Sequence, residues 1–172
     1  FLKVVVTEYN PKWPAQFEAE VTELRKVFDA ELLQIHHIGS TSVPGLKAKP
    51  IIDIMPIVKD IRAVDGITDK MVELGYEAMG EYGIPGRRYF RKGGDNRTHH
   101  VHVFQVDSGD VQRHLAFRDF LRVHPEEARR YGELKASLAE LHPDDIEAYM
   151  DGKHNYVQQV EVQALQWAKR EQ

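Results

Sequence analysis

The order of apolar and polar positions predicts a mixed α/β chain that begins with a helix. From Trp13 to Leu32 the apolar residues recur every three to four positions, which is typical of a helix packed by one face on a sheet. Pro14 suits the first turn of this helix, because its missing N–H would have no partner there in any case. We therefore expect the sheet to begin directly after this helix.

Shorter apolar runs predict the strands, and a later return to helical spacing predicts a helical tail. Strands are expected at 33–38, 50–58, 76–79, 88–91 and 101–106, an extended arm or short strand at 4–6, and helices at 60–74, 111–122, 125–141 and 146–169. Pro125 and Pro143 mark the breaks between the last three helices, and Gly75 ends the helix at 60–74. The expected fold class is α/β (α+β), a single domain of residues 1–172 with a mixed sheet core at 1–109 and a helical tail at 110–172 packed on it.

Composition narrows the classes of protein that fit. The chain has 172 residues, enough to bury a substantial core, and a net charge of −4, which argues against general nucleic-acid binding. The absence of cysteine excludes disulfides and thiolate metal sites. No apolar run is long enough to cross a bilayer, so we expect a cytoplasmic protein with no membrane partner. Nothing in the sequence indicates an oligomeric state.

The segment 35–55 carries the first candidate chemistry. Gly39, Ser40, Thr41 and Ser42 offer backbone N–H groups and three hydroxyls, a combination suited to binding phosphate. The alternative is a strand-to-helix turn capped by a Ser or Thr side chain. Asp53 follows inside the apolar run 50–57, where a carboxylate is costly unless it binds a metal, caps a loop or pairs with a cation such as Lys47 or Lys49.

The sequence HIGSTSVPGLKAKPIIDI resembles the GrpB-like proteins, whose fold belongs to the nucleotidyltransferase superfamily of DNA polymerase β. The resemblance extends over nearly the whole chain. It includes Trp13-Pro14, Gly75-Tyr76, the run 98–104, the run 117–122, Tyr149, Lys153 and Tyr156. It implies a nucleotidyltransferase-like mixed sheet with flanking helices, a nucleotide held by the Gly-Ser loop, and Asp53 as the catalytic ligand of a divalent metal, Mg²⁺ or Mn²⁺.

One position departs from the superfamily, which has a second acid two residues after the first. Here that position is Met55, and residues two apart on a strand share a face. A thioether therefore stands where an oxygen ligand for Mg²⁺ is expected, although Mg²⁺ prefers oxygen. A nucleotidyl transfer that uses two metal ions therefore lacks one of its metal-binding carboxylates in this sequence.

Histidines are the candidates to replace the missing acid. His100 and His102 point to one face of their predicted strand, and they would converge on Asp53 if the two strands are neighbours. Such a set suits Zn²⁺, Mn²⁺, Fe²⁺ or Ni²⁺ better than Mg²⁺. The alternatives are histidines that hydrogen-bond their neighbours or contact phosphate directly. His36 or His37 could supply one further imidazole.

Cationic residues supply the other candidates. Arg88, within a cluster around the predicted turns, could clamp a phosphate in bidentate fashion or belong to a solvated hairpin. Lys49 and Lys153 are further candidates for phosphate contacts. Lys153 with Tyr149 and Tyr156 would form one helix face, for which solvation and packing are the alternative.

Three functions follow from these residues and from the resemblance. The first is a metal-dependent nucleotidyltransferase in which the α-phosphate is attacked and pyrophosphate leaves, with positioning and charge neutralisation supplying most of the catalysis. Fusion of some relatives to dephospho-coenzyme A kinase makes a coenzyme A precursor, ATP or GTP the expected ligand. The alternatives are an inactive nucleotide-binding module or scaffold, and a phosphoesterase that uses His100, His102 and a metal-bound water.

Overall fold

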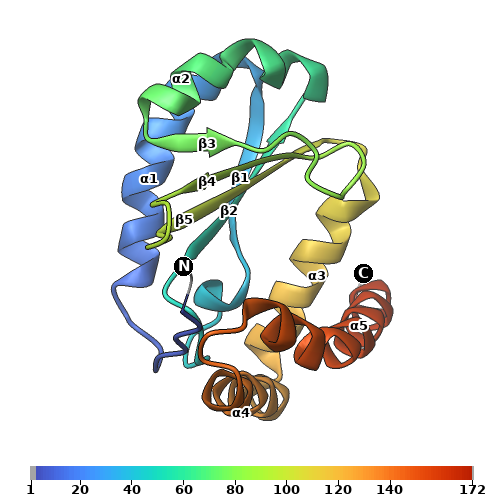
Figure 1. Ribbon diagram of the computed structural model, residues 1–172. Coiled ribbons are helices and arrows are strands. Elements are labelled where there is room, and N and C mark those ends of the chain that lie inside the picture. The colour runs from blue at the N-terminus through green and yellow to red at the C-terminus, as the bar shows by residue number, and fades with distance from the viewer. Residues whose placement is uncertain (1–2, 172) are drawn as a thin grey trace. The chain divides into compact units, whose positions relative to one another are not determined.

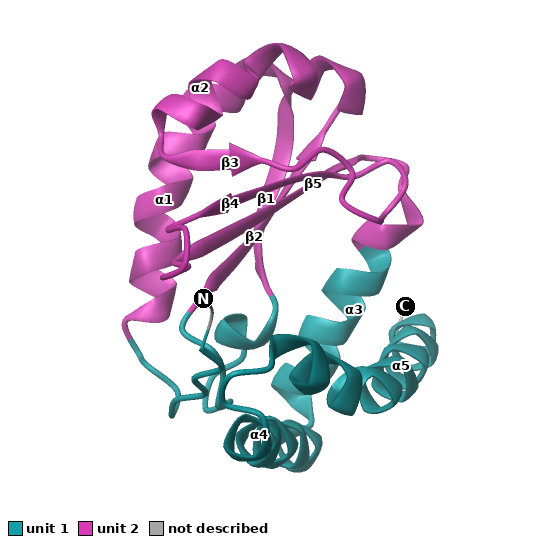
Figure 2. Cartoon of the chain, in the orientation of Figure 1, with its two compact units in different colours: residues 1–11, 39–50, 112–172 teal, residues 12–38, 51–111 magenta. Residues whose placement is uncertain are grey.

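The computed structural model describes residues 3–171, and the chain divides into two compact units. The sheet unit comprises residues 12–38 and 51–111, and the helical unit comprises the described parts of 1–11, 39–50 and 112–172 (Figure 2). Each unit is therefore assembled from segments that are distant in the sequence. Whether both form the predicted single domain stays a prediction, although the expected boundary at 110 lies next to the start of helix α3 at Gly109.

The sheet unit contains a five-stranded mixed sheet in the order β1-β2-β5-β4-β3 (Figure 1). The strands are β1 Leu32–Ile38, β2 Ile52–Val58, β3 Tyr76–Ala78, β4 Arg88–Lys92 and β5 His99–Gln105. β2 and β5 run parallel, whereas the other neighbouring pairs are antiparallel. All five expected strands are confirmed with small shifts at their ends.

Helix α1, Trp13–Phe28, covers one face of this sheet and buries Phe17, Val21 and Leu24 as its spacing predicts (Figure 1). The helix is shorter than expected, because Asp29 adopts a left-handed φ of 49° and a 3-10 turn, η1 Asp29–Glu31, follows. Leu32 is therefore the first residue of β1 and not part of the helix, which corrects the prediction.

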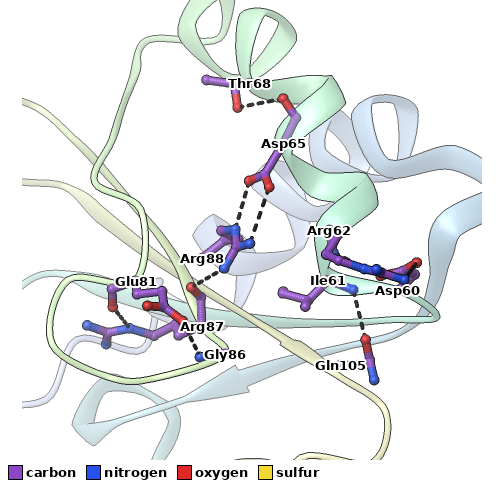
Figure 3. Close-up of polar contacts among 10 residues, drawn as sticks. All are labelled: Asp60, Ile61, Arg62, Asp65, Thr68, Glu81, Gly86, Arg87, Arg88 and Gln105. Atoms are coloured by element: carbon purple, nitrogen blue, oxygen red, sulfur yellow. Dashed lines mark hydrogen bonds and ion pairs between the residues drawn. The ribbon is translucent and has the colours of Figure 1, made fainter.

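The predicted helix at 60–74 is also corrected, because it consists of a 3-10 segment, η3 Ile61–Ile67, and a short helix, α2 Thr68–Glu73. The Asp60 carboxylate accepts a hydrogen bond from the Arg62 N–H at 3.0 Å, and the Ile61 N–H donates to the side chain of Gln105 at 3.1 Å (Figure 3). Gly66 lowers the helical propensity further. A local cap by Asp60 and a tertiary hydrogen bond to Gln105 thus fix the start of this 3-10 segment.

The helical unit contains α3 from residue 112 onward, α4 and α5, as the spacing after position 110 predicts. Their bounds are Gly109–Val123, Pro125–Leu141 and Ile146–Arg170. One core cluster includes Leu46, Phe120 and Tyr131, and a second consists of Val4, Leu138 and Tyr149 with their partly buried neighbours. The segments that precede and interrupt the sheet unit therefore supply core residues to the helices.

Residues 4–6 form neither helix nor strand. An isolated bridge follows between Thr7 and Ala48, whose two backbone hydrogen bonds measure 2.9 and 3.1 Å. Val4 donates its N–H to the carbonyl of Pro143 at 2.9 Å. Among the helices of residues 3–171, none combines the length and the apolar character that a membrane span requires.

Candidate functional site

Asp53, His100 and His102 lie together on one face of the sheet unit. Because β2 and β5 are parallel neighbours, Asp53 is paired with His100 in the strand register. One potential ligand atom from each of the three lies within 4.8 Å of the others, and residues 3–171 contain no other group of three of this kind. The structure therefore brings the three predicted metal ligands together, while metal binding itself stays a prediction.

Hydrogen bonds assign a proton position within this cluster. Oδ1 of Asp53 is 3.0 Å from Nε2 of His102 and 3.5 Å from Nδ1 of His100. Nη1 of Arg87 is 3.3 Å from Nδ1 of His102. Because a guanidinium can only donate, we assign Nδ1 of His102 as the acceptor and Nε2 as the protonated nitrogen that donates to Asp53.

Burial and hydrogen bonding set the charges of the site. Burial raises the pKa of Asp53, but the hydrogen bonds and charges of His100 and His102 outweigh it, so the net pKa is lowered. Burial also lowers the pKa of His102, and the hydrogen bond from its ring to Asp53 only partly compensates. An ionised carboxylate beside a neutral imidazole is the ionisation state that metal ligands require.

His100 contributes the most available donor atom. Its Nε2 is buried and has no hydrogen-bond partner among the residues that the structure describes. The nitrogen of His102 nearest to Asp53 carries a proton in our assignment, and moving that proton to Nδ1 would place it against the N–H of Arg87. The donor set fits a divalent transition metal, with Asp53 and His100 as the better-disposed ligands.

Tyr89 and Arg87 complete the surroundings of the cluster. The Tyr89 ring centroid lies 5.6 Å from that of His100 and 5.3 Å from that of His102, and Cζ of Arg87 lies 4.7 Å from it. Burial and the charge of Asp53 raise the pKa of Tyr89 to about 12, so its hydroxyl stays protonated at neutral pH. The sequence reasoning missed Arg87, although alternation along the strand places it on the same face as Tyr89.

Arg88, the arginine that the sequence favoured, pairs with an acid within the sheet unit. Its Nε and Nη2 donate to Oδ1 and Oδ2 of Asp65 in η3 at 2.7 and 3.2 Å, and its Nη1 donates to the carbonyl of Arg87 at 3.1 Å (Figure 3). Arg88 also pairs in register with Val103, one residue from the partner of Tyr89. Phosphate binding by Arg88 stays a prediction, and it would compete with this bidentate pair.

The neighbouring positions of β1 and β2 contribute no further ligand. Met55, two residues after Asp53, is fully buried, so no oxygen donor is present at that position. His37 stacks on Phe17 with ring centroids 4.7 Å apart, and Nε2 of His36 lies 2.9 Å from Oε1 of Gln34. Neither histidine belongs to the group that surrounds Asp53.

The Gly-Ser loop belongs to the helical unit and forms a 3-10 turn, η2 Ser40–Ser42. Gly39 has a φ of 72°, a conformation that favours glycine. The hydroxyl of Ser42 donates to the Gly39 carbonyl at 2.5 Å, which is the local capping that the alternative interpretation expects. Nε of Arg122 donates to the Ser42 carbonyl at 3.0 Å. Phosphate binding by Gly39, Ser40, Thr41 and Ser42 stays a prediction.

Lys49 and Lys153 also lie in the helical unit, where both contact one tyrosine. Their Nζ atoms are 5.2 and 5.4 Å from the ring centroid of Tyr149. Tyr156, on the same helix, stacks its ring on Tyr131 and donates its hydroxyl to Glu127 at 2.9 Å. The expected association of Lys153 with Tyr149 is present, whereas its role in phosphate binding stays a prediction.

Comparison with known proteins places the chain in a family. The family model described as GrpB protein matches residues 3–163. The chain belongs to the GrpB family. The crystal structure of the conserved protein GrpB from Enterococcus faecalis has a TM-score of 0.93 and 48% sequence identity, and the match covers 95% of this chain and 99% of that one.

Two proteins that the chain matches are longer than the matched region. The UPF0157 protein YqkA of Bacillus subtilis is 47% identical over 167 residues, which are 97% of this chain and 49% of YqkA. A dephospho-CoA kinase of Mycolicibacterium paratuberculosis is 26% identical over 92% of this chain and 45% of its own length. The chain thus spans about half the length of each of these two relatives.

More distant solved structures establish the fold class of this GrpB-family chain. The structure of Cid1 in complex with its short product ApU has a TM-score of 0.52 and 11% identity, covering 74% of this chain and 41% of that one. At this identity the likeness concerns the fold alone. The predicted nucleotidyltransferase-like fold, a mixed sheet with flanking helices, is confirmed.

Proposed function

We propose that this GrpB-family chain binds a divalent transition metal at Asp53 and His100 and is a metal-dependent nucleotidyltransferase. The observation that carries the proposal is the convergence of Asp53, His100 and His102, with potential ligand atoms within 4.8 Å of one another on a nucleotidyltransferase-like sheet. Imidazole donors favour Zn²⁺ or Mn²⁺ over Mg²⁺. When bound, such an ion would polarise a phosphoryl oxygen as a Lewis acid.

The residues around Asp53 have distinct roles in this proposal. Asp53 supplies a carboxylate whose orientation is fixed by the N–H of His102, at 3.0 Å. Arg87 holds His102 in turn through Nδ1, at 3.3 Å. His100 supplies an imidazole whose Nδ1 lies 3.5 Å from Oδ1 of Asp53 and whose Nε2 has no hydrogen-bond partner among the described residues. His102 and Arg87 therefore position the carboxylate, much as hydrogen-bonded neighbours orient the ligands of known metal sites.

The proposed substrate is a nucleoside triphosphate or a nucleotide cofactor. Two fold neighbours with a TM-score above 0.5 are Cid1 structures, one in complex with the product ApU and one bound to MgGTP. The match to a dephospho-CoA kinase supports a coenzyme A precursor, ATP or GTP as candidates. We propose that the Gly39–Ser42 turn contacts the phosphates through its N–H groups and the hydroxyl of Ser40.

Two other functions are each favoured by one observation. Met55 is fully buried at the position of the second acid, which favours a nucleotide-binding module without catalysis. The histidine pair favours a phosphoesterase with a metal-bound water as nucleophile. The products separate the three functions: pyrophosphate from a nucleoside triphosphate indicates transfer, inorganic phosphate from a phosphate ester indicates hydrolysis, and binding without turnover indicates a module.

Metal binding is tested first, by calorimetric titration of chelator-treated protein with Zn²⁺, Mn²⁺ and Mg²⁺. We expect one Zn²⁺ or Mn²⁺ per chain, and a loss of affinity of at least about tenfold in Asp53→Ala and in His100→Ala. His154→Ala is the matched control, because His154 is an exposed histidine on α5. Equal affinity in all four proteins, or no binding by the wild type, would exclude the metal site.

A further inference from the structure

The loop between β3 and β4 presents one large aromatic side chain to solvent. Tyr82 is 54% exposed, although its ring stacks on that of Tyr89 in β4 with the two centroids 5.3 Å apart. The φ of Tyr82 is 48°, in the left-handed region that residues with a side chain rarely adopt. Such a backbone conformation persists only where surrounding contacts fix it, so the exposed ring is held in place at a cost.

Arg87 fixes this loop and connects it to the candidate metal centre. Nε of Arg87 donates to the Glu81 carbonyl at 3.2 Å, and the Glu81 carboxylate accepts from the Gly86 N–H at 2.6 Å (Figure 3). Nη2 of Arg87 donates to the Tyr82 carbonyl at 2.9 Å, while Nη1 lies 3.3 Å from Nδ1 of His102. The residue is 7% exposed. One buried guanidinium therefore holds both the loop and a histidine of the candidate centre.

Strand β4 supplies the contacts to the Tyr82 ring. Tyr89 and Arg91 are two residues apart on this strand and therefore share one face. Cζ of Arg91 lies 5.6 Å from the Tyr82 centroid, and its Nη1 donates to the Tyr82 hydroxyl at 3.5 Å. Tyr89 contacts His100 and His102 in turn, with centroids 5.6 and 5.3 Å apart. The exposed part of the Tyr82 ring is therefore separated from the candidate metal ligands by a single aromatic ring.

We propose that Tyr82 is the residue on which the base of the substrate nucleotide stacks. The inference rests on the proposed function and extends it from the phosphates to the base. A nucleobase is flat and aromatic, so it would continue the stack formed by Tyr89 and Tyr82. A nucleotide carries phosphate at one end and a base at the other, which matches a candidate metal centre with a fixed aromatic ring nearby. Stacking of this kind tolerates every base, because each base has an aromatic face.

The test is calorimetric titration of the intact chain with ATP, GTP, CTP and UTP, each with Mn²⁺ and again with a chelator. We expect at least one triphosphate to bind the wild type, and its affinity to fall at least about fivefold in Tyr82→Leu, which has no aromatic face. Tyr82→Phe keeps the ring and should bind within about twofold of the wild type. Val72→Ala is the control, because Val72 on α2 is also 54% exposed. No binding by the wild type, or equal affinity in Tyr82→Leu, would overturn the proposal.

Inorganic tripolyphosphate separates stacking from a structural role for Tyr82. It lacks the base, so the wild type and Tyr82→Leu should bind it equally, and a parallel loss for both ligands would refute the proposal. If tripolyphosphate does not bind, the contrast between Tyr82→Phe and Tyr82→Leu decides, because both keep a large apolar side chain.

The titrations also distinguish failure of this inference from failure of the proposed function. Nucleotide binding that is indifferent to Tyr82 refutes the stacking alone. A Tyr82 effect that persists with chelator and in Asp53→Ala, in a chain that binds neither Zn²⁺ nor Mn²⁺, supports the stacking and refutes the metal centre alone.

Discussion

Replacing Glu20 with glutamine is expected to destabilise the sheet unit, because Glu20 connects α1 to the sheet. Its Oε2 accepts a hydrogen bond from the Tyr76 hydroxyl at 2.6 Å and pairs with Nζ of Lys92 at 2.8 Å. The Glu20 side chain is 10% exposed and that of Lys92 is 27% exposed, so solvent only partly screens the pair. Glutamine keeps the shape and one acceptor oxygen but removes the charge.

The expected loss of unfolding free energy is about 2 kcal/mol at pH 7. A hydrogen bond to a charged group contributes about 1.5–3 kcal/mol, and the partly exposed lysine pair adds less than about 1 kcal/mol. The glutamine side chain can still accept a hydrogen bond from the Tyr76 hydroxyl, so the expected loss lies toward the lower end of this range. For a chain of this size the melting temperature should fall by about 4–8 °C.

The pH dependence follows from the direction of the Glu20 pKa. Burial raises this pKa, but the hydrogen bonds from Lys92 and Tyr76 and the charges of His99 and Lys92 outweigh burial, so the folded pKa is lowered. The stabilisation is therefore complete above the unfolded value of about 4.3 and is lost as pH falls through the lower folded value. The difference between wild type and variant should be largest near pH 7 and shrink below about pH 4.

The assay is urea denaturation followed by tryptophan fluorescence. The chain has two tryptophans, Trp13 in α1 of the sheet unit and Trp167 in α5 of the helical unit, so a Trp167→Phe background reports on the sheet unit alone. Glu23→Gln is the control, because Glu23 forms an exposed pair with Lys26 at 3.4 Å. A loss below about 0.5 kcal/mol for Glu20→Gln, or a difference unchanged between pH 7 and pH 3.5, would refute the reasoning.

Two further predictions concern the candidate metal centre. Met55→Asp should cost at least about 3 kcal/mol without metal, because it places a carboxylate at a fully buried position. Added Mn²⁺ should recover part of the loss in thermal melts, and identical melting with and without Mn²⁺ would exclude a site completed by this acid. Arg87→Met removes the donor to Nδ1 of His102, so long-range proton–nitrogen NMR spectra should show a mixture of ring tautomers where the wild type shows one. An unchanged spectrum would mean that Arg87 does not set the tautomer.

Much of the fold could be predicted from the sequence because periodicity is a local property. The three-to-four spacing of α1 and of the C-terminal helices, and the apolar runs of the five strands, are each encoded within a few consecutive residues. The same alternation predicted that His100 and His102 share one face, whereas the position of their strand beside that of Asp53 came from the structure. Where tertiary bonds compete with local preference, as in η3, the expected helix was wrong.

The candidate site depended on pairings that no short sequence window contains. Arg87 and Arg88 are adjacent in sequence, yet they have different partners. Arg87 contacts His102, whereas Arg88 forms a bidentate ion pair with Asp65. The stacking of Tyr82 on Tyr89 likewise became visible only in the folded loop. The sequence alone determined most helices and strands and the chemically reactive residues, because these follow from residue types and their spacing over a few positions. The tertiary structure alone decided which donor meets which acceptor, because hydrogen bonds depend on distances between segments that are far apart along the chain.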